Sequence, residues 1–276
     1  MKTRVLFIGG CGRSGSTLLS VFLNAHPGMV SVGELKFLPE WIARDAPCTC
    51  GRPVSACEFW RDIAAGLAGR RRAESGESGE SATRLGDEEL SEVIEAVRDR
   101  TGCRVIVDSS KTVADLDRLK RREDIDLYVI HLVRDGRGYL RSRTKPVKHS
   151  TVRPEVQEPV SAVKAIGRWL ATNLEYSRQD ARLPPDRLMR VRYEDFVRDP
   201  ESELARICGF VGLEFDPAML EDGMHDCHDI GGNGWRYAQS SAIRLELDES
   251  WRRRLSPWQK LLFAVGASWL NRRYGY

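Results

Sequence analysis

The most regular feature of the chain is an alternation of two patterns of apolar residues. Short continuous apolar runs, typical of buried strands in a parallel sheet, occupy positions 5–8, 30–32, 104–107, 127–133 and 188–191. Segments with apolar residues at helical spacing lie between or after them, at 17–25, 87–101, 114–122, from about 138, 160–182 and 200–211. Strands that alternate with helices predict one α/β domain over residues 1–276, a three-layer fold with a central parallel sheet flanked by helices.

Three segments depart from this pattern. Residues 41–60 mix Pro, Gly, Cys and Trp and predict a loop with a short helix. Residues 70–84 are polar and of low complexity, which predicts a mobile insertion at the surface. Near the end, Ser256 and Gln259 form a capping-box pattern that predicts a helix with an apolar stripe. Such a stripe usually packs on the core, although a membrane or partner contact is the alternative.

Composition narrows the class of protein. With 41% hydrophobic and 30% charged residues among 276, the chain is typical of a soluble globular protein. A net charge of +3 is too small to indicate a nucleic-acid surface, and no apolar run is long enough for a membrane span. Seven scattered cysteines do not form a disulfide framework, so we expect a reducing, cytoplasmic setting. Arg accounts for 35 of the 43 basic residues, so the positions of individual arginines matter more than their total.

A glycine-rich segment follows the first predicted strand and opens the first predicted helix. This place suits an anion, because glycines let the backbone approach closely and the helix start offers free N–H groups. The candidate residues are Gly12, Arg13, Ser14, Gly15, Ser16 and Thr17. The pattern resembles a Walker A loop with Ser16 in place of the Lys, which argues against a kinase. An ordinary strand–helix turn is the alternative.

A second basic element follows the 127–133 strand. Arg134 stands directly at the strand end, where ligands bind in open parallel sheets. Ser142 follows about two helical turns later, so the two side chains could bracket one anion. The alternative is a solvated basic helix face paired with Asp135.

Together these motifs resemble the sulfotransferase family, in particular its bacterial members. The 12–17 segment is similar to the family's 5′-phosphosulfate loop, and Arg134 with Ser142 is similar to its 3′-phosphate element. Segments 108–111, 192–196 and 231–236 also resemble parts of the family. The resemblance implies a P-loop-like fold and the donor 3′-phosphoadenosine 5′-phosphosulfate (PAPS), with adenosine 3′,5′-bisphosphate (PAP) as product. It also implies that Tyr193 reaches the adenine region and that Arg236 contacts the donor phosphates.

Sulfuryl transfer needs a base for the acceptor proton and cations for the charge that develops. Glu34 is the candidate base, and the resemblance supports it, since other members place a His in the segment matching 108–113, where this chain has none. Lys111 and Arg13 are the candidate cations. The alternatives are a surface carboxylate or helix cap for Glu34 and a solvated side chain for Lys111. No metal is required on these grounds, because a sulfuryl group carries less negative charge than a phosphoryl group.

Two cysteine and histidine groupings are weaker signals. Cys48, Cys50 and Cys57 offer three metal ligands at nonstandard spacing and lack a fourth, so we expect buried thiols or a structural loop near the acceptor pocket. His225 and His228 flank Cys227 without an evident partner.

The sequence thus predicts a sulfotransferase acting on a hydroxyl group of a small-molecule acceptor. The alternatives are a P-loop kinase-like phosphotransferase and a non-catalytic nucleotide-binding protein. The acceptor and the oligomeric state, a homodimer included, stay open.

Overall fold

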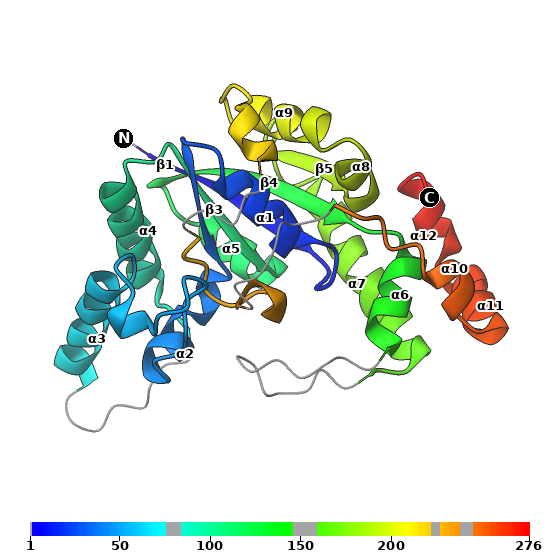
Figure 1. The fold of residues 1–276 in the computed structure, drawn as a ribbon, viewed down its shortest axis with the longest axis horizontal. Coiled ribbons are helices and arrows are strands. Elements are labelled where there is room, and N and C mark those ends of the chain that lie inside the picture. The colour runs from blue at the N-terminus through cyan, green and yellow to red at the C-terminus, as the bar shows by residue number, and fades with distance from the viewer. Residues whose placement is uncertain (1, 76–83, 146–158, 222–226, 238–244) are drawn as a thin grey trace.

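The computed structural model describes residues 2–75, 84–145, 159–221, 227–237 and 245–276. Its centre is a sheet of five parallel strands in the order β2-β3-β1-β4-β5 (Figure 1). The strands are β1 (Thr3–Gly10), β2 (Met29–Gly33), β3 (Val105–Lys111), β4 (Ile125–Val133) and β5 (Leu188–Arg192). The predicted α/β fold with a parallel sheet is therefore confirmed.

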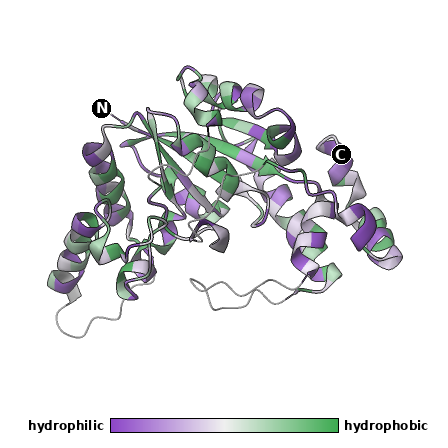
Figure 2. Cartoon of the chain, viewed as in Figure 1, coloured by the Kyte–Doolittle hydropathy of each residue, from purple (hydrophilic) through white to green (hydrophobic). Residues whose placement is uncertain are grey.

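Helices cover both faces of this sheet. They are α1 (Ser16–Asn24), α2 (Leu38–Ala43), α3 (Arg61–Ser75), α4 (Asp87–Thr101), α5 (Val113–Lys120), α6 (Gly136–Thr144), α7 (Ala162–Gln179), α8 (Tyr193–Arg198), α9 (Pro200–Phe210), α10 (Trp251–Arg254), α11 (Pro257–Gly266) and α12 (Ser268–Arg273). Figure 2 shows the hydrophobic strands in the middle and the more polar helices around them.

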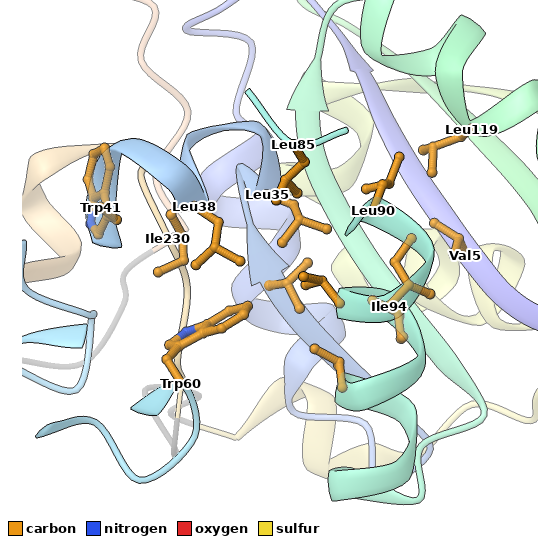
Figure 3. Close-up of a cluster of buried hydrophobic side chains, with 14 of the residues drawn as sticks. Val5, Leu35, Leu38, Trp41, Trp60, Leu85, Leu90, Ile94, Leu119 and Ile230 are labelled. Carbon is orange, nitrogen blue, oxygen red and sulfur yellow. The ribbon is translucent and has the colours of Figure 1, made fainter. Parts of the chain in front are cut away.

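Strand β1 connects the two halves of the core, because its side chains alternate between the faces of the sheet. Val5 and Phe7 join the cluster formed with α2 to α5, part of which Figure 3 shows. Leu6 and Ile8 join the opposite cluster, formed with α1, α8 and α9. A third cluster packs α6, α7, α11 and α12 around the end of β4.

Two predicted boundaries are wrong. Strand β3 continues through the polar residues 108–111, because Asp108 and Lys111 still pair with β1. Within this stretch, Asp108 Oδ1 accepts hydrogen bonds from the amide and hydroxyl of Ser110. Residues 70–75, expected to begin an irregular insertion, are the last turns of α3, where Arg71 forms an ion pair with Glu89 of α4. Residues 76–83 of that expected insertion lie outside the described residues.

The C-terminal segment forms two helices instead of the single predicted one. Phe263 of α11 packs into the core. Leu262 of the stripe is partly buried against the same cluster. The other members, Trp258, Leu261, Val265 and Trp269, are exposed, contrary to the expectation that the stripe packs on the core. Among the described residues, no helix has the length and apolar composition needed to cross a bilayer.

Candidate active site

The predicted site residues lie along one edge of the sheet, where all five strands end. Crossing the sheet in spatial order, Glu34 follows β2, Lys111 ends β3, the glycine-rich loop follows β1, Arg134 follows β4 and Tyr193 follows β5. Ligands of open parallel sheets bind at this edge. The topology therefore places the carboxylate and lysine on one side of the loop, and the arginine and tyrosine on the other.

The loop between β1 and α1 is shaped as an anion cradle. Gly15 caps α1 with a φ of 97°, and a Cβ at this position would lie 2.3 Å from the ring of Tyr193, so only glycine fits there. Ser14 is buried, and its Oγ has no hydrogen-bond partner among the described residues. A buried hydroxyl without a partner is costly, and an anion in the cradle would satisfy it.

Two arginines extend the cradle on its β4 side. Arg134 Nη1 donates to the backbone oxygen of Arg13 at 2.9 Å, and Arg13 Nε donates to Ser142 Oγ at 3.3 Å. The Arg134 guanidinium lies over the Tyr193 ring, 4.8 Å from its centre. Burial, together with the neighbouring charges of Arg143 and Arg134, lowers the pKa of Arg13. The structure thus brings these predicted residues together as a region of concentrated positive charge, which favours an anionic ligand.

On the other side of the loop, Glu34 and Lys111 form a buried ion pair. Lys111 Nζ lies 2.6 Å from Glu34 Oε1, and Lys36 Nζ lies 3.6 Å from Oε2. Burial lowers the pKa of Lys111, and the charge of Glu34 opposes this effect. The backbone amide of Gly232 also donates to Glu34 Oε1, at 3.1 Å. The sequence analysis did not identify Lys36 or the contact between Gly232 and Glu34. For Lys36, the only signal in the sequence is its position two residues after Glu34.

The backbone at the site departs from common conformations. Among the described residues, three non-glycine positions have positive φ, and two of them are Arg13 (77°) and Lys111 (73°). Such strained residues concentrate at functional sites. This independent observation supports the two predicted cations.

The segment after residue 227 joins the two sides of the site. Ile230 pairs with the end of β2, since its amide donates to Val32 and its carbonyl accepts from the amide of Glu34 at 2.6 Å. A Cβ on Gly232 would lie 3.5 Å from Thr17 Oγ1, so the same segment also borders the cradle.

Arg236 is buried in the segment that follows residue 227. It is 1% exposed and forms an ion pair with buried Asp229. Its Nε and Nη2 have no hydrogen-bond partner among the described residues, and its contact with the donor phosphates stays a prediction.

A fourth potential metal ligand, His228, lies beside the three loop cysteines. Ligand atoms of Cys48, Cys50, Cys57 and His228 lie within 4.8 Å of one another. The expectation of three ligands without a fourth is therefore wrong, because residues 171 to 180 positions apart meet only in the fold. His225 lies outside the described residues.

Comparisons of the sequence with known proteins all point to sulfotransferases. A family model described as "Sulfotransferase family" matches residues 6–217. Human carbohydrate sulfotransferase 2 is 29% identical over 179 residues, which cover 52% of this chain and 34% of that protein, so the chain spans about a third of its length.

Two solved structures share the fold. A sulfotransferase domain from the curacin biosynthetic pathway has a TM-score of 0.62 at 20% identity, covering 96% of this chain and 97% of that one. A mouse sulfotransferase solved with PAP has a TM-score of 0.50 at 12% identity, covering 99% of this chain and 86% of that one.

Proposed function

The chain belongs to the sulfotransferase family, and from that premise we propose that it transfers a sulfuryl group from PAPS to a hydroxyl group of a small-molecule acceptor. The observation that carries the proposal is the order of groups along the sheet edge. A carboxylate–ammonium pair, an anion cradle and an arginine–tyrosine pair follow one another from β2 to β5. This order suits a nucleotide with two anionic ends whose reacting end faces the carboxylate.

The donor half of the proposal uses the cradle and its arginines. The amides at the start of α1, the free hydroxyl of Ser14 and the fork of Arg13 bind the 5′-phosphosulfate. Arg134 and Ser142 bind the 3′-phosphate, and the ring of Tyr193 borders the adenine. The unpartnered Ser14 Oγ and the lowered pKa of Arg13 support an anion at this place.

The transfer half uses Glu34 and Lys111. Glu34 takes the proton of the acceptor hydroxyl, and the acceptor oxygen attacks sulfur in line with the bridging oxygen of the donor. The bond between sulfur and that oxygen breaks, and PAP leaves with its electron pair. Lys111 and Arg13 stabilise the negative charge that develops on the leaving phosphate. The products are a sulfate ester and PAP, and Glu34 returns its proton to water.

A phosphotransferase is the alternative within the same fold. Ser16 occupies the place of the lysine that contacts the terminal phosphates in a Walker A loop, which disfavours it. Calorimetric titration separates the two: our proposal expects PAP to bind and ATP with Mg²⁺ not to compete with it. Competition by ATP with Mg²⁺ at similar affinity would favour the phosphotransferase.

The activity is tested with sulfur-labelled PAPS and a panel of hydroxyl acceptors. The name of the human relative, a carbohydrate sulfotransferase, makes saccharides the first arm. Phenols and aliphatic alcohols form the other arms. We expect label in at least one acceptor, with one PAP formed per ester.

A protein that binds PAP but transfers label to no acceptor would instead be the non-catalytic alternative. The reducing, cytoplasmic setting expected from the scattered cysteines is part of this proposal.

A further inference from the structure

Four metal-ligating side chains meet at one point of the fold. Cys48, Cys50 and Cys57 come from the loop between α2 and α3, and His228 comes from the segment that pairs with β2. Cys48 and Cys57 are fully buried. No contact in the proposed reaction uses these side chains.

Three of the six distances among these atoms are close to those of a tetrahedral zinc site, and all six are within 4.8 Å. Zinc–sulfur bonds of about 2.3 Å and zinc–nitrogen bonds of about 2.0 Å place neighbouring ligand atoms about 3.5–3.8 Å apart. Cys50 Sγ lies 3.7 Å from Cys57 Sγ, and His228 Nδ1 lies 3.7 Å from Cys48 Sγ and 3.3 Å from Cys57 Sγ. We propose that Cys48, Cys50, Cys57 and His228 bind one Zn²⁺ ion as a structural site.

The surroundings hold the ligands in place. Thr49, between two of the cysteines, accepts from the amide of Asp229 at 2.8 Å and donates to the carbonyl of Cys227 at 2.6 Å. It thereby fixes the residues on both sides of His228. The ring of Phe59 stacks on His228, with centres 5.0 Å apart and planes 8° apart. Contacts of this kind orient metal ligands in proteins.

The turns of the loop also suit a metal. The amide of Gly51 donates to the Cys48 carbonyl at 2.9 Å, and the amide of Trp60 donates to the Cys57 carbonyl at 3.1 Å. Both turns satisfy the backbone carbonyl of a cysteine within the loop itself. Trp60 Nε1 donates to the His228 carbonyl, and this hydrogen bond links the end of the cysteine loop to the segment that holds His228.

The donor set decides the kind of metal and its role. Three thiolates and an imidazole are soft and borderline ligands that suit zinc and do not suit Mg²⁺ or Ca²⁺. Four protein ligands fill a tetrahedral coordination shell and leave no position for a substrate, as in structural zinc sites. The ion would hold the 48–57 loop against the 228–232 segment.

This segment leads directly to the active site. Two residues after His228, Ile230 accepts from the amide of Glu34, and Gly232 donates to its carboxylate. Figure 3 shows Ile230 and Trp60 in the same buried cluster. Zinc would therefore order the backbone that positions Glu34. This consequence rests on the proposed function, whereas metal binding does not.

The test measures metal in the untagged full-length chain, purified without chelator and analysed by mass spectrometry of the elements. We expect about one zinc per chain. Cys50→Ser should lower the zinc content by more than about tenfold. The matched control is Cys103→Ser, which changes an equally half-buried free cysteine outside the cluster and should keep the zinc.

A second measurement keeps the test decisive if Cys50→Ser does not fold. Replacing the metal of the unmodified chain with Co²⁺ should give the intense visible absorption of tetrahedral cobalt with thiolate ligands. An intact chain that neither carries zinc nor takes up Zn²⁺ or Co²⁺ would overturn the proposal. A Cys50–Cys57 disulfide in protein purified under reducing conditions, or equal zinc in both serine variants, would also overturn it. These outcomes do not depend on transfer activity, so they are independent of the proposed function.

Discussion

Lys111 Nζ lies 2.6 Å from Glu34 Oε1, and both side chains are largely buried at the ends of neighbouring strands. The two side chains form an ion pair beside the cradle. In the proposed reaction Glu34 takes the acceptor proton and Lys111 stabilises the leaving phosphate, so this ion pair holds the two proposed groups side by side.

Replacing Lys111 by Met should slow the chemical step. The variant keeps the length of the side chain but removes the charge, so we expect kcat to fall by about 10²-fold or more. PAP affinity should change much less. Lys120→Met, at the end of α5, is the control and should keep kcat. A change in the KM for PAPS with kcat intact would show that Lys111 only binds the donor.

Gly15→Ala should destabilise the protein, because the new Cβ meets the Tyr193 ring at 2.3 Å and the φ of 97° strains any side chain. We expect a loss of about 1–3 kcal/mol in the free energy of unfolding and weaker PAP binding. Gly12→Ala is the matched control in the same loop, since its Cβ would have no atom within 4 Å. Equal unfolding free energies of the two variants, measured in urea, would contradict this packing.

Arg134→Gln should weaken recognition of the 3′-phosphate. We expect PAP affinity to fall about 10- to 100-fold, as for the loss of a charged hydrogen bond, while affinity for adenosine 5′-phosphate changes little. The control is Arg137→Gln, which removes a charge in the first turn of α6 that is paired with Asp135. It should leave both affinities unchanged. Equal losses for the two nucleotides would instead place Arg134 away from the 3′-phosphate.

Buried His131 should make stability depend on pH. Burial is the main cause that lowers its pKa to about 3, and its hydrogen bond to Asn173 opposes this shift. In the unfolded chain the ring takes up a proton below about pH 6.5. The free energy of unfolding should therefore fall as the pH drops from 6.5 towards 3, by about 2 kcal/mol at pH 5.

His131→Gln keeps a donor for Asn173 and should remove that part of the pH dependence. Urea unfolding of both proteins at pH 7 and pH 5 measures the difference. The same slope in the variant as in the unmodified chain would show that His131 is not held neutral.

The sequence predicts the parts of this site that depend on local pattern. Apolar runs reveal the strands, and the glycine-rich loop and Arg134 follow them directly, so their meeting at one sheet edge needs only a parallel topology. The sequence does not predict the full length of β3, because Asp108 and Ser110 are polar, and only in the fold do their mutual hydrogen bonds offset part of the cost of burial.

Contacts between distant segments could not be predicted. His228 completes the cysteine cluster, and Gly232 reaches Glu34, only because residues 228–232 return to the edge of β2. The same return buries Arg236 against Asp229, which no motif in the sequence reveals.

The central claim is that Glu34 is the base of sulfuryl transfer, and the rate of label transfer from PAPS by Glu34→Gln tests it most directly. The control is Glu40→Gln on α2, whose carboxylate pairs with the exposed Arg44. We predict that kcat of Glu34→Gln falls about 10²–10⁴-fold, with PAP affinity retained, while the control keeps its rate. Transfer by Glu34→Gln at the rate of the unmodified chain would contradict the account.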